Sequence, residues 1–366
     1  MKGIYIYSSN DKDYLANGEA KKVLSQVRAF REAGVDIKLL DVVLDKKIDK
    51  IIYRLPFCGV YPRSFIRQCE AEAVDSQFVF IRKNIFDGTY YRLLKTIKKA
   101  NPSIKIVVEI PTFPYFQEWR RLIDKPLIWK EKKVIPKVKK EQLVDFYLTL
   151  TDDLEIYGIP TIKFDNCIVV DDYSKKKNLQ NAEEIHLIGV ALLAAWHGYD
   201  RVVTGMRDYY SVNADNGEKV FFHIVGEGPE YKNLKNLVEQ YNLDKYVSFE
   251  GKQKGETLDH LYDISDVGIG PLGLYRKGLQ SAKSLKLREY CAKGLPFIKG
   301  GGDTLFDEYA YCLSVSNDDE PIDISKIVEW ARTIDYEKAA ESMREYAVHN
   351  FDWRRYIDSI LKDIEG

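Results

Sequence analysis

The sequence has few cysteines, no long apolar run and almost no net charge. Its five cysteines are scattered without a CxxC pair, so the sequence suggests neither a disulfide framework nor a zinc site. No run of about 18 apolar residues occurs, which argues against a membrane-spanning helix. The start, MKGIYIYSSNDKD, lacks the features of a signal peptide. A net charge of −1 argues against a nucleic-acid partner. These absences predict a cytoplasmic protein.

What the sequence does contain is an alternation of apolar strands and amphipathic helices. Its 366 residues favour two domains, and 45 % hydrophobic residues are enough for a sizeable core in each. Strand–helix–strand order predicts right-handed βαβ units and parallel sheets, hence an α/β fold. The expected strands are 2–8, 35–42, 78–82, 104–110, 146–150 and 161–164, then 184–190, 219–225, 247–249, 267–269 and 297–299. The expected helices are 18–33, 89–100, one that contains 201–206, 230–241, 257–264, 284–293 and those of the tail 324–366.

Two residues of the first half lie where parallel sheets bind ligands, at the carboxyl ends of strands. Glu109 ends the strand 104–110 and could bind or activate a hydroxyl, although such carboxylates also cap the following turn. Gly18 follows the loop after the first strand and allows close backbone approach, although a plain helix-initiating turn fits equally well.

The second half has glycines after its second strand, at Gly226 and Gly228. A dinucleotide fingerprint would need a third glycine where Tyr231 stands, so a nicotinamide site is disfavoured. Glu250 does lie about 20 residues on, where a ribose-binding acid is expected, so such a site is not excluded.

The helix expected over 284–293 has the most distinctive chemistry of the second half. Ser284 is a suitable N-cap, and Gly294 with Pro296 ends the helix. Lys286 and Glu289 are three residues apart and share one face near the helix start. A helix N-terminus and a lysine suit a diphosphate, and the carboxylate could accept two ribose hydroxyls. The alternative is a surface salt pair.

Two further patterns each have a plain alternative. The triplet Asp11-Lys12-Asp13 could hold a metal, but a solvated loop is favoured, so no metal site is expected. The segment 124–142 holds seven lysines with interleaved apolar residues. It could lie on an anionic membrane surface as a peripheral contact, while the alternative, a solvated charged segment, is favoured.

The order of motifs in the second half resembles a known family. GEGPE after a strand, then VSFEG, LDHLYDISDVGIGPL and KSLKLREYCAKGLPFI, resembles the donor domain of GT-B glycosyltransferases, in particular family 4 or group 1. NFDWRRYIDSIL is similar to that family's C-terminal crossover helix. The resemblance implies two Rossmann-like βαβ domains facing a central cleft. It implies an acceptor-binding domain over 1–170, a nucleotide-sugar-binding domain over 171–345, and a helix over 346–366 that packs back on the first domain.

The resemblance also implies roles for individual residues. Glu289 matches the second carboxylate of the family's Glu-x7-Glu pair, which binds the ribose hydroxyls, while Ser281 stands where the first is expected. The family's diphosphate-binding arginine and lysine would fall on Leu192 and His197, so other cations are needed. The candidates for this charge are His197, Arg276, Lys277 and Lys286, with Lys286 first and Arg276 second.

Backbone sites follow from the same resemblance. Gly251 and Lys252 lie where the family holds the base, and Gly18 matches the loop that approaches the donor sugar and acceptor. Gly226, Gly228 and Ser284 complete the predicted donor site.

The implied activity is the transfer of a hexose from a UDP- or GDP-sugar to a hydroxyl of a cell-surface saccharide or a lipid-linked acceptor. This activity belongs to polysaccharide biosynthesis and is expected to be retaining, metal-independent and without a cofactor, the donor being a substrate. If the reaction inverts instead, Glu109 is the candidate base. Two alternatives remain: a sugar-nucleotide epimerase on the same fold, and a non-catalytic protein that binds carbohydrate or a partner.

Overall fold

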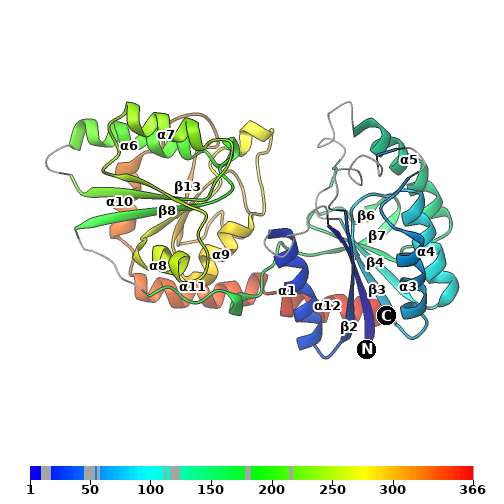
Figure 1. Ribbon diagram of the computed structural model, residues 1–366. Helices are drawn as coiled ribbons and strands as arrows, with labels where there is room; N and C mark the ends of the chain where they lie inside the picture. The colour runs from blue at the N-terminus through cyan, green and yellow to red at the C-terminus, as the bar shows by residue number, and fades with distance from the viewer. Residues whose placement is uncertain are drawn as a thin grey trace. The chain divides into compact units, whose positions relative to one another are not determined.

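The computed structural model describes residues 1–9, 18–44, 54–55, 58–110, 113–115, 124–177, 183–213 and 217–365. These residues form two compact units, each built around its own sheet (Figure 1). Unit 1 comprises Met1–Val169 and Trp353–Gly366, and unit 2 comprises Val170–Asp352.

Unit 1 has a seven-stranded sheet whose neighbours are parallel except for the last pair. Its order is β2-β1-β3-β4-β5-β7-β6, and only β6 and β7 run antiparallel. Central strands such as β3 are buried along their whole length, as expected when helices cover both faces of a parallel sheet. The strands are β1 (Lys2–Ser9), β2 (Asp36–Val43), β3 (Phe78–Arg82), β4 (Lys105–Ile110), β5 (Phe146–Thr149), β6 (Glu155–Ile156) and β7 (Ile159–Lys163).

The helices of unit 1 form two layers. On one side of the sheet lie α3 (Arg63–Ala73), α4 (Gly88–Ala100) and α5 (Lys125–Lys140), and on the other α1 (Gly18–Glu32) and α12 (Trp353–Glu365) (Figure 1). Asp87 begins α4, because its Oδ1 accepts hydrogen bonds from the amides of Thr89 and Tyr90.

Unit 2 has a six-stranded parallel sheet in the order β10-β9-β8-β11-β12-β13. Its strands are β8 (Glu184–Val190), β9 (Lys219–Val225), β10 (Val247–Gly251), β11 (Val267–Ile269), β12 (Phe297–Gly300) and β13 (Cys312–Val315). One face carries α6 (Tyr199–Asn213), α7 (Tyr231–Gln240) and α10 (Ile324–Arg332). On the other lie α8 (Glu256–Ile264), α9 (Leu285–Lys293) and α11 (Tyr336–Phe351) (Figure 1).

The α/β fold with two βαβ-based sheets is confirmed, and the expected strands agree closely with those observed. Helix α3 and strands β6 and β13 were not predicted, and the lysine-rich segment 124–142 contains the helix α5. Helix α5 escaped prediction because charged residues interrupt its apolar face and Pro136 lies inside it. None of the helices described here is both long and apolar enough to cross a bilayer. After α11, which belongs to unit 2, the chain returns to unit 1 as α12.

Candidate active site

Backbone hydrogen bonds join the loops at the carboxyl edge of the unit 2 sheet. The Gly226 amide donates to Gly251 O at 2.7 Å, and the Leu193 amide donates to Glu227 O at 2.9 Å. A Cβ at Gly226, where φ is +131°, would lie 1.8 Å from Ala191 O. One at Gly228 would lie 2.3 Å from the carbonyl oxygen of Leu193. Both positions therefore require glycine, because a side chain would prevent these loops from packing against each other.

Lys286 lies in the first turn of α9 and points toward the loop after β8. Its Nζ donates to Tyr199 Oη at 2.9 Å and lies 3.3 Å from His197 Nδ1. The side chain is half-buried, and burial lowers its pKa from 10.5 to about 7, although nearby Glu289 raises it. An anion bound near this ammonium group would raise its pKa and keep it charged at neutral pH.

His197, which the sequence suggested as a source of positive charge, ends a short 3₁₀ turn after β8, Ala195–His197. Burial, together with the charges of Lys286 and Lys277, lowers the pKa of His197 to about 2, so its ring is neutral. Lys277 Nζ lies 4.7 Å from the centre of the Trp196 ring. The salt bridges found among the described residues include neither Lys286 nor Lys277. The cluster can therefore accept an anionic ligand.

Glu289 lies one turn beyond Lys286 on α9 and is half-buried. Its Oε1 accepts a hydrogen bond from Tyr173 Oη at 2.9 Å, which orients the carboxylate. Ser284 is the N-cap residue of α9 but makes no side-chain capping bond. The first two turns of this helix thus bring together the cation, the carboxylate and a helix N-terminus, as the sequence suggested.

Arg276, the second cation expected to bind phosphate, is already paired within unit 2. Its guanidinium forms two hydrogen bonds with the Asp200 carboxylate, at 2.8 and 2.7 Å, and a third with Asp319 at 2.9 Å. It also donates to Ala195 O at 2.8 Å. These bonds raise the pKa of Arg276 and neutralise its charge locally. The arrangement favours a role in holding the loops together over direct binding of a diphosphate.

Gly251 ends β10, and Lys252 follows it at the same edge of the sheet. Gly251 has φ +65° and open space around its Cα, so another chain or a ligand can approach closely. Lys252 is exposed and lies 3.3 Å from Glu227 in a solvent-screened pair. The position expected for the base is therefore open at the surface of unit 2.

In unit 1, Glu109 lies at the end of β4, fully buried among cations. Arg82 Nη1 lies 2.7 Å and Lys22 Nζ 3.0 Å from its Oε1, and Gln26 donates to its Oε2 at 3.1 Å. Burial alone would raise the pKa of Glu109, but Arg82, Lys22 and Gln26 lower it to about 2. Such a carboxylate is a poor proton acceptor, so the geometry favours charge compensation. Gly18 is the first residue of α1.

No group of three or more His, Cys, Asp or Glu side chains that could hold a metal ion occurs in the described part of the chain. The triplet Asp11-Lys12-Asp13 lies outside the described residues. Two partners that position the site were missed from the sequence, Tyr199 and Tyr173. The sequence has 25 tyrosines, but their number does not indicate which of them lie at the site. The hydrogen bonds of Tyr199 with Lys286 and of Tyr173 with Glu289 each join residues more than 80 positions apart.

The chain is similar to known proteins in part of its sequence and in its fold. Residues 170–299 match the family described as "Glycosyl transferases group 1". No curated protein matches the chain significantly. Among solved structures, a sucrose-phosphate synthase from Thermosynechococcus elongatus has a TM-score of 0.60 at 16 % identity, covering 99 % of this chain and 98 % of that one.

Two other solved structures are similar over nearly their whole length. The apo form of a lipopolysaccharide outer core galactosyltransferase, WaaB, has a TM-score of 0.59 at 12 % identity, with 99 % and 100 % coverage. A structure described as "Trehalose-6-phosphate from E. coli bound with UDP-2-fluoro glucose" has a TM-score of 0.62 at 13 % identity, with 99 % and 98 % coverage. At these identities the likeness shows the fold, which is GT-B.

Proposed function

We propose that this chain, which matches the group 1 family of glycosyltransferases over residues 170–299, transfers a hexose from a UDP- or GDP-sugar to a hydroxyl group. The proposal places the donor at the carboxyl edge of the unit 2 sheet. Its acceptor is a cell-surface saccharide or a lipid-linked saccharide, which assigns the enzyme to polysaccharide biosynthesis.

The proposal depends on two side chains of α9. Lys286 forms no salt bridge with any described residue, and the carboxylate of Glu289 lies one helical turn away. In a nucleotide sugar, a diphosphate is flanked by a ribose, so a cation and a carboxylate at this spacing match both groups. When the bond to the sugar breaks, negative charge grows on the diphosphate, and a poorly neutralised lysine stabilises that charge more than it stabilises the ground state. Glu289, held by Tyr173, would accept the ribose hydroxyls.

We propose a metal-independent, retaining reaction. Lys286 and the α9 N-terminus would supply the positive field that a metal supplies elsewhere. The departing phosphate oxygen can accept the acceptor's proton on the same face of the sugar, so no protein base is required. The low pKa of Glu109 agrees with this route, because it disfavours that residue as a general base.

The donor and location remain parts of the proposal with separate support. The galactosyltransferase and the complex with UDP-2-fluoro glucose among the similar structures support a UDP-hexose. Gly251 and Lys252 would border the base. The lysines of α5 support peripheral contact with the inner face of a membrane, where a lipid-linked acceptor would be met.

The test uses UDP-glucose, UDP-galactose and GDP-mannose. Calorimetry measures their binding, and mass spectrometry of the products measures their turnover. We expect Lys286→Gln and Glu289→Ala each to weaken donor binding at least about tenfold, since each removes a charged contact. Lys326 and Glu329 on the exposed side of α10 have the same spacing, so Lys326→Gln/Glu329→Ala is the matched control.

Each outcome decides between the hypotheses. Equal donor affinity in the control and in both site variants would overturn the donor site. Conversion of the nucleotide sugar without an acceptor would favour an epimerase. Failure of every nucleotide sugar to bind the wild type would favour the non-catalytic alternative.

A further inference from the structure

A groove of about 640 Å³ lies between α3 and α4 of unit 1. The two helices pack against each other on the face of the sheet opposite α1 and α12 (Figure 1). Ile66 lies in the groove and is buried, while the outward-facing side chains around it are mostly cationic. Those cations are Arg63, Arg67, Arg92 and Lys99. The groove belongs to unit 1 and is separate from the donor site.

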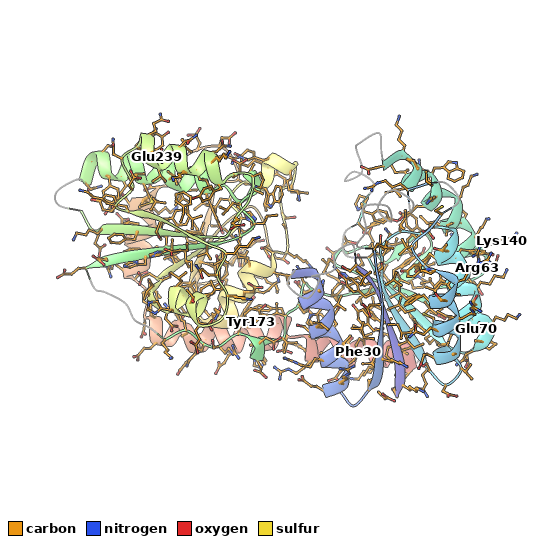
Figure 2. The ribbon with its side chains drawn as sticks, viewed as in Figure 1. Phe30, Arg63, Glu70, Lys140, Tyr173 and Glu239 are labelled. Carbon is orange, nitrogen blue, oxygen red and sulfur yellow. The ribbon has the colours of Figure 1, made fainter. Side chains whose placement is uncertain are left out.

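These four cations are exposed and have no carboxylate partner. No hydrogen bond or ion pair formed by a described residue involves the side chain of Arg63, Arg67, Arg92 or Lys99. Glu70 is the carboxylate that lines the groove, so four cations against one anion leave three positive charges. Figure 2 labels Arg63 and Glu70 on α3. Positive charge left unpaired in a groove attracts multivalent anions.

The neighbouring helix α5 continues the positive surface. It packs beside α4 and buries Leu127, Val134 and Val138 toward the core. Its outward side exposes six lysines, Lys125, Lys132, Lys133, Lys137, Lys139 and Lys140. Trp129 is 41 % exposed, and Lys133 Nζ lies 3.9 Å from the centre of its ring. The whole chain has a net charge of only −1, so this side of unit 1 is strongly positive by comparison.

We propose that the α3–α4 groove binds the phosphate-bearing headgroups of an anionic bilayer, with α5 lying on the same surface. Arginine guanidinium groups bind phosphate oxygens through two parallel hydrogen bonds, and three arginines border this groove. Lysines near an anionic leaflet add attraction that salt screens. An exposed tryptophan beside lysine is the combination favoured at headgroup depth, which a soluble polyanion would not require.

The test measures co-flotation of the purified chain with lipid vesicles. One set contains phosphatidylcholine alone, and the other contains 30 % phosphatidylglycerol. The groove variant is Arg63→Gln/Arg67→Gln/Arg92→Gln. The matched control, Lys219→Gln/Lys232→Gln/Lys245→Gln, removes three exposed charges from unit 2. Circular dichroism checks that both remain folded, and donor hydrolysis in solution checks that the site in unit 2 is unaffected.

We expect the wild type to bind only the anionic vesicles, and more weakly as salt is raised. The groove variant should bind on the order of a hundredfold more weakly, since each basic residue near an anionic membrane contributes several-fold. The control should bind like the wild type. Vesicle binding that is equal for the groove variant and the control would overturn the proposal, as would equal binding to neutral vesicles.

Soluble anions distinguish other occupants of the groove. Inorganic phosphate, heparin and single-stranded DNA are tested by calorimetry on the same proteins. Groove-dependent binding of any of these without binding to anionic vesicles would replace the membrane by a free phosphate, a polysaccharide or a nucleic acid, and would refute the proposal. Because vesicle binding is measured without a nucleotide sugar, failure here is independent of failure of the proposed transferase activity.

Discussion

Replacing Lys286 with methionine should make the ligand-free protein more stable while removing donor binding. The pKa of Lys286 falls from 10.5 to about 7 because the ammonium is partly removed from water without a paired anion. Below this folded-state pKa, Lys286 carries a partly buried charge, which lowers the free energy of unfolding. Methionine keeps the apolar stem and a similar volume but carries no charge. The substitution therefore removes an energetic cost that donor binding would otherwise offset.

The magnitude follows from the two pKa values. The folded state binds this proton less readily than the unfolded state, so the free energy of unfolding rises with pH between about 7 and 10.5. The charge then costs about 4 kcal/mol at pH 7 and about 1 kcal/mol at pH 9.5. Residual solvent contact and loss of the hydrogen bond to Tyr199 offset part of the gain. We expect Lys286→Met to gain about 2 kcal/mol at pH 7 and almost nothing at pH 9.5.

Urea denaturation at the two pH values, with Lys326→Met as control, measures this difference. Subtracting the wild-type curve from each variant's cancels the titration of the other groups. The control should show no pH-dependent difference, because Lys326 is exposed on α10. A variant that is less stable than the wild type at pH 7, or a difference that does not change with pH, would refute the reasoning. Either result would mean that Lys286 is already neutralised in the ligand-free protein.

Three other substitutions test separate contacts. Glu109→Gln should destabilise unit 1 by about 3–5 kcal/mol, because it leaves two buried cations without their carboxylate; urea denaturation measures it. Tyr173→Phe should raise KM for the donor roughly three- to tenfold with little change in kcat, because Glu289 loses its orienting hydrogen bond; steady-state kinetics measures it. Gly226→Ala should cost about 3 kcal/mol or more, because its Cβ would collide with Ala191 O; thermal unfolding measures it.

Two of these substitutions, at Glu109 and at Gly226, have a control of their own. The carboxylate of Glu109 has a pKa of about 2 when folded and 4.5 ordinarily, so its contribution is present above pH 4.5 and disappears as pH falls toward 2. Glu109→Gln should lack this loss of stability at acidic pH. If Glu109→Gln folds normally but has a low kcat, that result would support Glu109 as a general base. Gly251→Ala is the control for Gly226, since it has a positive φ but open space. Equal losses at both glycines would contradict the collision.

Much of the fold was predictable because its determinants are local. The helix expected over 284–293 is α9, Leu285–Lys293, and Gly294 ends it with φ +73°. Buried strands such as β4 and β9 were visible as short apolar runs between turn residues. The placement of Lys286 and Glu289 on one face also followed from helical periodicity alone.

The sequence by itself determined the order of strands and helices, the glycine positions and the spacing of charges on α9. Only the tertiary structure decided which of those charges are compensated. Arg276 meets Asp200 across 76 positions and is neutralised there, whereas Lys286 meets Tyr199 across 87 positions and remains without a paired carboxylate. Local propensity depends on neighbours in the chain, but the electrostatic state of a side chain depends on what the fold brings within a few ångströms of it.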